Sequence, residues 1–152
     1  MSKITPFLWF DGQVEEAINF YTSVFKNAKV HSINRAGPSG PVFSATFELE
    51  GQEFYALNGG PMYKFNEAIS FFISCKTQEE VDYYWNKLTA DGGEESRCGW
   101  LKDKFGLSWQ VIPDRLGELL QHKDPAKAQK AMNAMMAMGK IIIADLEKAV
   151  ED

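Results

Sequence analysis

Gln110 is the polar residue best placed for chemistry in this chain. It lies in the strand-like stretch 107–113, directly after a charged turn. Because side chains alternate along a strand, Ser108 and Ile112 are expected on the same face as Gln110. The opposite face is expected to carry Leu107, Trp109 and Val111. The amide of Gln110 either orients a ligand or is a buried group with its own hydrogen bonds.

Cysteine and histidine supply no second reactive group. Cys75 and Cys98 form no CxxC pair and have no histidine near them in sequence, which predicts two reduced, partly buried thiols rather than a disulfide or zinc site. His31 falls in a predicted edge strand and His122 near a helix end. No Ser-His-Asp set or activated cysteine can be assembled, so whether the protein is an enzyme stays open.

The composition predicts one soluble domain. The chain has 152 residues, of which 45% are hydrophobic and 24% charged. A net charge of -5 argues against a nucleic-acid partner, because phosphate binding requires a clustered positive field. No stretch is apolar for the roughly 18 residues that a membrane span needs, and no targeting segment is visible. We therefore expect a cytoplasmic protein without a membrane partner.

The predicted elements follow the same order twice. The first half predicts a strand at 4–10, an amphipathic helix at 13–25, and strands at 29–35, 42–50 and 52–58. The second half predicts a strand at 68–75, a helix capped by Thr77 and ended by Gly92, and strands at 94–98, 100–104 and 107–113. This repeat predicts an α+β fold with two βαβββ modules, whose curved, cup-like mixed sheets bury their inner faces.

The domain is expected to span 1–152, with modules at about 3–60 and 67–113 and a helical tail at 114–152. In the tail, Asp124 and Pro125 predict a helix start, and a final short helix is expected at 142–150. Small and methionine side chains form one face of the tail: Ala128, Ala131, Met132, Met135, Met136 and Met138. Such a face suits either the cover of a sheet or a protein interface.

Three stretches carry a family resemblance: ITPFLWFDG at 4–12 with EAINFY at 16–21, ALNGGP at 56–61, and CGWLKDKFGLSWQ at 98–110. QEEVD at 78–82 and GKI at 139–141 add to it. Together they resemble the vicinal oxygen chelate superfamily, which has the glyoxalase and bleomycin-resistance fold. Within it they are similar to the PhnB-like branch, labelled 3-demethylubiquinone-9 3-methyltransferase-like.

The resemblance also tests for a metal. Metal-using members of the superfamily hold a divalent ion through His, Glu or Gln on the first and last strands of each module. The matching positions here are Thr5 or Pro6, Ser70 or Ile69, one of residues 55–58, and Gln110, where metal-using relatives usually carry Glu. One neutral amide does not hold such an ion. No metal and no other cofactor are therefore expected.

The same resemblance implies which residues line the cup. The expected ligand-binding set is Thr5, Phe7, Trp9, Asn58, Ser70, Phe72, Ser108 and Gln110, together with Ser74. Such a lining suits a small, partly apolar or planar ligand. The alternative for Phe7 and Phe72 is that they fill a core. The charges of Lys102 and Asp103, near the mouth of the cup, are expected to belong to a solvated turn.

These inferences favour a metal-free protein that binds an unknown small molecule, of the sequestering or resistance type. The alternative is a lyase, isomerase or dioxygenase that uses a weakly held divalent metal with Gln110. Methyl transfer ranks last, because no Gly-rich turn joins a strand to a helix. Two-module chains of the superfamily commonly form dimers, so the resemblance implies a homodimer with residues 124–150 near the interface.

Overall fold

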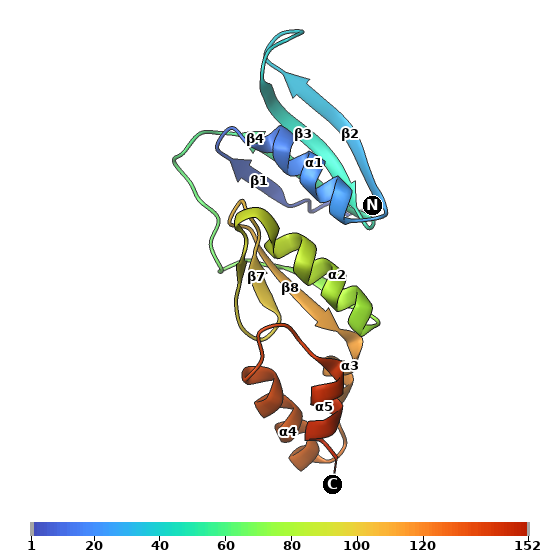
Figure 1. Ribbon diagram of the computed structural model, residues 1–152. Coiled ribbons are helices and arrows are strands. Elements are labelled where there is room, and N and C mark those ends of the chain that lie inside the picture. The colour runs from blue at the N-terminus through green and yellow to red at the C-terminus, as the bar shows by residue number, and fades with distance from the viewer. Residues whose placement is uncertain (1, 152) are drawn as a thin grey trace. The chain divides into compact units, whose positions relative to one another are not determined.

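The computed structural model describes residues 2–151 and divides between Phe65 and Asn66 into two compact units (Figure 1). Each unit contains one βαβββ module. The first contains β1 (Phe7–Phe10), α1 (Val14–Val24), β2 (Ala28–Arg35), β3 (Val42–Leu49) and β4 (Gln52–Asn58). Its strands lie in the order β1-β4-β3-β2, with β1 parallel to β4 and the other pairs antiparallel.

The second unit repeats this topology and adds the tail. It contains β5 (Phe71–Cys75), α2 (Gln78–Thr89), the 3-10 turn η1 (Ala90–Gly92), β6 (Glu94–Glu95), β7 (Trp100–Lys102) and β8 (Ser108–Pro113). The strand order is β5-β8-β7-β6, and β5 is parallel to β8. The prediction of an α+β fold with two mixed sheets is confirmed.

One helix covers one face of each sheet. In the first unit, α1 buries Val14, Ile18 and Tyr21 against alternate residues of the strands, such as Phe47. The rings of Phe47 and Phe54 stack with centroids 5.3 Å apart. In the second unit, the face that α2 covers contains Leu101, Trp109 and Val111, so the prediction for β8 is confirmed.

The opposite face of each sheet, called the open face here, is not the one that α1 or α2 covers, and in the second unit the tail packs on it only at the Ile112 end of β8. It is not a filled core. Phe7 on β1 and Phe72 on β5 are each 59% exposed. The alternative in which these two rings fill a core is therefore wrong for both units as described.

Three predicted strands are each three residues too long. The first begins at Phe7, so Thr5 precedes it, and the fifth begins at Phe71, so Ser70 precedes that strand directly. The sixth ends at Glu95. Its predicted continuation fails because Cys98 and Gly99 both have positive φ angles, 60° and 84°, which turn the chain out of extended geometry.

The turn between β7 and β8 is built around a buried carboxylate. Asp103 is only 2% exposed. Its oxygens accept hydrogen bonds from the amides of Phe105 and Leu107, at 2.9 and 3.0 Å, and from the indole Nε1 of Trp109 at 2.9 Å. The prediction of a solvated turn is thus wrong for Asp103, because this carboxylate organises the turn from within.

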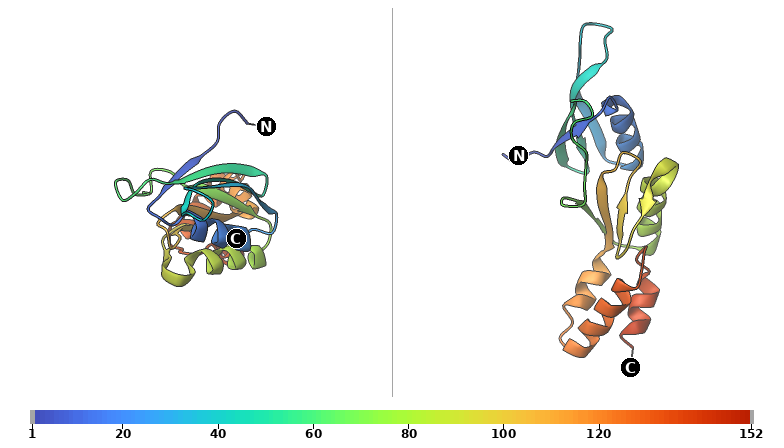
Figure 2. Two further views of the ribbon diagram at one scale, coloured as in Figure 1. Left: turned by 90° about the horizontal axis from the view of Figure 1, so that it is seen from above. Right: turned by 90° about the vertical axis from the view of Figure 1, so that its left-hand side faces the viewer.

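The tail forms three helices: α3 (Asp114–Leu120), α4 (Pro125–Met136) and α5 (Ile143–Ala149) (Figure 2). Asp124 caps α4 as predicted, accepting a hydrogen bond from the Ala126 amide at 2.9 Å. The predicted methionine face is split by the packing. Ala131 is buried and Met135 and Met138 pack against the tail core, whereas Met132 and Met136 are 37% and 56% exposed.

The tail core includes a residue of the sheet. Ile112 of β8 clusters with six buried tail residues, Leu116, Leu119, Ala131, Ile141, Leu146 and Val150. A Cβ at Gly99 would lie 2.5 Å from Ile112 Cδ1 and 3.1 Å from Ile141 Cγ1, so only glycine leaves room for this packing. The tail is therefore packed onto the module rather than merely connected to it.

Hydrogen bonds fix the segment that leads from α4 into the first residue of α5, called the strap here (residues 138–143), to the module. The amides of Cys98 and Gly99 donate to the carbonyls of Met138 and Gly139, both at 2.8 Å. Gln78 donates to the Ile141 carbonyl at 3.0 Å and accepts from the Ile143 amide at 2.7 Å.

An ion pair at 2.8 Å joins Lys140 to Asp82. It lowers the pKa of Asp82, with a further contribution from the Gln78 amide. None of the described helices is long and apolar enough to cross a bilayer.

Candidate functional site

The open face of the second sheet brings several predicted site residues together. The Gln110 side-chain amide donates to the Ser70 hydroxyl at 3.0 Å, although the two residues are 40 positions apart in sequence. Phe72 is the register partner of Gln110 on β5, and Trp100 is its partner on β7. The half-buried amide of Gln110 therefore lies between two aromatic residues, and its position is fixed by Ser70.

Ser108 lies on the same face and is fully buried. Its hydroxyl has no hydrogen-bond partner within residues 2–151. A buried hydroxyl without a partner costs about 1–3 kcal/mol, so such a group calls for a specific explanation. The alternation argument placed Ser108 correctly, but it contained no signal that the hydroxyl would lack a partner.

The open face of the first sheet is more fully occupied by internal contacts. Phe7 meets Tyr55 edge to face, with centroids 5.5 Å apart. Trp9 donates its indole N–H to the Gly60 carbonyl at 2.8 Å, and its ring meets Tyr63 at 4.9 Å. Trp9 is thus held by the loop after β4. Its predicted role in stacking on a ligand requires a face of the ring that these contacts leave open.

The polar residues of the same face pair with one another across β2 and β3. The hydroxyls of Ser32 and Thr46 are hydrogen bonded, and Asn34 donates to Ser44 at 3.0 Å. Thr5, by contrast, stands half-buried before β1, outside the strand that was expected to carry it.

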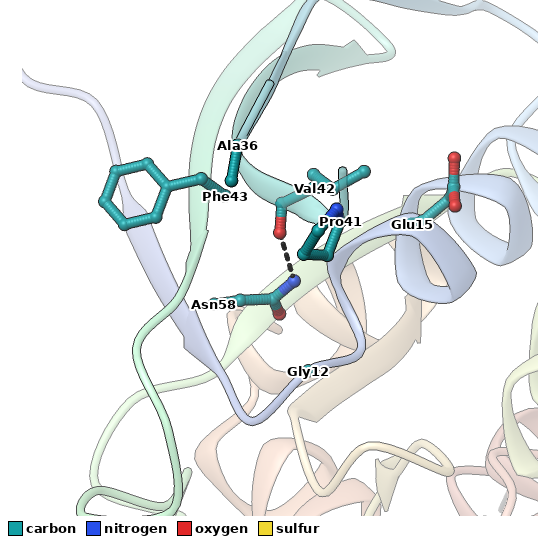
Figure 3. Close-up of a pocket in the computed structure, with 7 residues that line it drawn as sticks. All are labelled: Gly12, Glu15, Ala36, Pro41, Val42, Phe43 and Asn58. Carbon is teal, nitrogen blue, oxygen red and sulfur yellow. Dashed lines mark hydrogen bonds between the residues drawn. The ribbon is translucent and has the colours of Figure 1, made fainter. Parts of the chain in front are cut away.

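Asn58 is committed to the fold of the first unit. Its Oδ1 accepts from the Val14 amide at the start of α1, at 3.0 Å, and its Nδ2 donates to the Val42 carbonyl at 2.9 Å. It lines a hollow of about 370 Å³ (Figure 3), together with Gly12, Glu15, Ala36, Pro41, Val42 and Phe43. The size is that of a small-molecule site. However, Glu15, its one charged group, is paired with Arg35 at 2.7 Å.

A second hollow, of about 180 Å³, lies in the second unit beside the open face. It is lined by Glu67, Glu94, Glu95, Ser96, Trp100 and Lys102. Lys102 bonds Glu67 at 3.2 Å, and the hydrogen bond from Lys102 lowers the pKa of Glu67. Glu95 accepts the indole N–H of Trp85 at 2.8 Å. Glu67 was not predicted as a site residue, because it lies in a linking segment with no motif around it.

The donor set for a metal ion does not fit. Among residues 2–151, no three His, Cys, Asp or Glu side chains gather as a divalent site requires. The positions that carry ligands in metal-using relatives hold neutral side chains here, and those of the second unit, Ser70 and Gln110, are bonded to each other. A hydroxyl and an amide are weak ligands for a divalent cation.

The two cysteines are expected to differ sharply in reactivity. Cys75 is fully buried, and burial, with the nearby carboxylates of Glu80 and Asp114, raises its pKa to about 12. Because the thiolate is the reactive form, a raised pKa keeps Cys75 inert at neutral pH. At pH 8, a maleimide is expected to modify half-buried Cys98 in the native protein and Cys75 only after denaturation. Mass spectrometry of the adducts checks this, and equal labelling of both in the native state would contradict it.

The comparisons with known proteins identify the family. The sequence model of the 3-demethylubiquinone-9 3-methyltransferase family matches residues 2–112. A structure from Bacillus cereus, titled a putative 3-demethylubiquinone-9 3-methyltransferase, PhnB protein, is 38% identical, with a TM-score of 0.68 over 74% of this chain and 99% of that one. None of the curated proteins matches.

More distant structures share the fold. A protein from Pseudomonas aeruginosa is 20% identical, with a TM-score of 0.62 over 74% of this chain and 98% of that one. The fosfomycin resistance protein FosX from Listeria monocytogenes, complexed with Mn(II) and sulfate, is 19% identical, with a TM-score of 0.51 over 72% of this chain and 90% of that one.

Nearly the whole module pair is matched, and the helical tail lies beyond residue 112, where the family match ends. The matched region contains the three stretches that carried the resemblance, and its topology is the repeated βαβββ module. The chain therefore belongs to the 3-demethylubiquinone-9 3-methyltransferase family.

Proposed function

We propose that the protein binds a small, partly planar organic molecule on an open face of its sheets and does so without a metal ion. The observation that carries this proposal is the arrangement around Gln110. An amide held by Ser70 at 3.0 Å lies next to Phe72, whose ring is 59% exposed. Exposed rings beside a few fixed polar groups are typical of ligand sites, in which stacking supplies affinity and hydrogen bonds supply orientation.

All of the predicted site residues keep a role in this proposal, but their roles differ. Ser70, Phe72, Ser108 and Gln110 share one sheet face in the second unit. Phe7 supplies an exposed ring in the first, with Trp9 and Thr5 close to it along the chain. Asn58 contributes by holding the start of α1, because both of its polar atoms are already bonded.

Native mass spectrometry of untagged protein tests the proposal, with metal analysis on the same sample. The expected result is a bound small molecule, displaced by Gln110→Ala or Phe72→Ala, and less than one equivalent of any divalent metal. Lys87→Ala, on the exposed side of α2, serves as the control that retains the ligand. Stoichiometric metal that is lost in Gln110→Ala would overturn the metal-free proposal.

That metal result would favour the alternative function, a lyase, isomerase or dioxygenase-type enzyme with a weakly held divalent ion. The observation that supports it is the fold shared with FosX, whose structure contains Mn(II). Methyl transfer ranks below both proposals. The family bears its name, but the β1–α1 junction has only Gly12 where a methyl-donor site usually has a Gly-rich turn. Calorimetry with the methyl donor showing saturable binding would reverse that ranking.

We further propose a cytoplasmic homodimer with residues 124–150 near its interface. The exposed Met132 and Met136 of α4 support this placement, since exposed methionines suit protein contacts. Light scattering after size exclusion is expected to give twice the 17.2 kDa chain mass at micromolar concentration. A monomer there would contradict the proposal, and Met136→Glu is expected to shift the equilibrium toward monomer while leaving the fold intact.

A further inference from the structure

The open face of the second sheet has a second polar row beside Gln110. Ser108 follows the same strand face two residues earlier, and its register partner on β7 is Lys102. Ser70, the hydrogen-bond partner of Gln110, directly precedes β5 on the other side. This row, defined as Ser70, Ser108 and Lys102, brings two serines and a lysine to neighbouring positions of one sheet face.

The three side chains of this row supply donors, and the acceptors beside them are the carboxylates of Glu67 and Glu94 next to Lys102. Ser108 is fully buried, and its hydroxyl has no partner within the described chain. The Ser70 oxygen already accepts from Gln110, which leaves its hydroxyl hydrogen to donate. Lys102 has three N–H donors and no acceptor. Groups of this kind are satisfied by an incoming oxygen acceptor, and an ammonium among them favours one that carries negative charge.

The protein itself shows that a carboxylate fits beside Lys102. The Glu67 oxygen lies 3.2 Å from Lys102 Nζ, and both residues line the hollow of about 180 Å³. Glu67 comes from the segment before β5 and its side chain is 62% exposed, so an exchange for another carboxylate leaves it in water. The hollow is lined by two other carboxylates. Glu94 is exposed and is the register partner of Lys102, whereas Glu95 accepts a hydrogen bond from the indole N–H of Trp85.

The adjacent row supplies planar surfaces. Phe72 and Trp100 flank Gln110 as its register partners on either side, and Phe72 is largely exposed. A flat ring over Gln110 can contact both aromatic side chains, because cross-strand neighbours lie about 5 Å apart. A carboxylate attached to that ring reaches the next row, two residues along β8.

From these two rows we propose that the second unit recognises small aromatic carboxylates, with the ring between Phe72 and Trp100 and the carboxylate exchanged for Glu67 on Lys102 and bonded by Ser108. This inference rests on the proposed function and names the ligand class for the open face of the second unit. It assigns Glu67 as an internal competitor for the ligand.

Calorimetric titration with benzoate tests the ligand class. Benzamide retains the ring without the charge, and cyclohexanecarboxylate retains the charge without the planar ring. Benzoate is expected to bind at least tenfold more tightly than either. Equal binding of benzoate and benzamide, or no binding of benzoate, would overturn the inference.

Four variants of the full chain test the residues. Lys102→Met is expected to weaken benzoate binding at least tenfold, and Ser108→Ala severalfold without loss of stability, because its hydroxyl has no internal partner. Glu67→Gln is expected to tighten binding severalfold by removing the competing charge. Lys87→Met, on α2, is the control and leaves affinity unchanged. Weaker binding in Glu67→Gln would refute the exchange.

Failure of the aromatic-carboxylate proposal can be distinguished from failure of the proposed binding function. If benzoate does not bind but native mass spectrometry finds another small molecule that Gln110→Ala displaces, the binding function stands and the ligand class is wrong. If neither is found, both proposals fail.

Discussion

Replacing Asp103 with alanine is expected to lower the free energy of unfolding by about 3–5 kcal/mol. The substitution leaves two backbone amides and the Trp109 indole N–H, all close to a residue that is 2% exposed, without their acceptor. Buried donors that lose a charged acceptor incur the full desolvation cost. Urea denaturation followed by tryptophan fluorescence measures the loss, with Trp109 as one of the four tryptophans that contribute to the signal.

Two further variants isolate the cause. Asp103→Asn keeps an acceptor oxygen but turns an amide group toward one of the three donors, so an intermediate loss is expected. Asp11→Ala removes a carboxylate that is exposed and is expected to change stability by less than about 0.5 kcal/mol. If Asp103→Ala were as mild as Asp11→Ala, the carboxylate would not organise the β7–β8 turn.

The second large effect is expected from Gly99→Ala, at about 2–4 kcal/mol. Two terms add up. Gly99 has a φ of 84°, which is unfavourable for alanine, and the new Cβ would lie 2.5 Å from Ile112 Cδ1 and 3.1 Å from the Val111 carbonyl oxygen. Because Ile112 joins the sheet to the tail core, the tail is expected to loosen first. Hydrogen exchange of the Cys98 and Gly99 amides, which bond the strap, measures that loosening.

Gly12→Ala is the matched control for this prediction. Gly12 has a similar φ, 78°, but a Cβ there meets nothing within 4 Å. Gly12→Ala therefore introduces the backbone strain without the steric clash. It is expected to lower the free energy of unfolding by about 1–2 kcal/mol and to leave the tail packed on the module. Equal losses in the two variants would show that the contact with Ile112 and Ile141 does not hold the tail.

Much of the fold could be predicted because hydrophobic periodicity is a local property. The helices at 14–24 and 78–89 and the alternation along β8 follow from spacing alone. The ends of the strands were harder to predict. β6 stops at Glu95 because the positive φ angles at Cys98 and Gly99 redirect the chain, and Cys98 is not a residue type that signals a turn.

The site was harder to predict because the decisive partners are distant in sequence. Gln110 could be placed on a strand face, but its bond to Ser70 depends on β5 and β8 pairing in one register. Asp103 looked like a solvated residue since charge patterns report the sequence neighbourhood, not burial. The side chains of Asn58 and Gln78 likewise accept hydrogen bonds from backbone amides that lie 44 and 65 residues away in the sequence.

The strap has a consequence for the order in which the chain folds during synthesis. The strand pairs of the first sheet close within residues 7–58, so that sheet can form while the ribosome is still adding the second module. Gln78, however, can accept its hydrogen bond from the Ile143 amide only after Ile143 has been synthesised, and the tail core is complete only when Val150 is present. Until these residues emerge from the ribosome, Ile112 stays uncovered. The final step of folding therefore requires residues 143–150, and a chaperone that shields the nascent second unit would act in this interval.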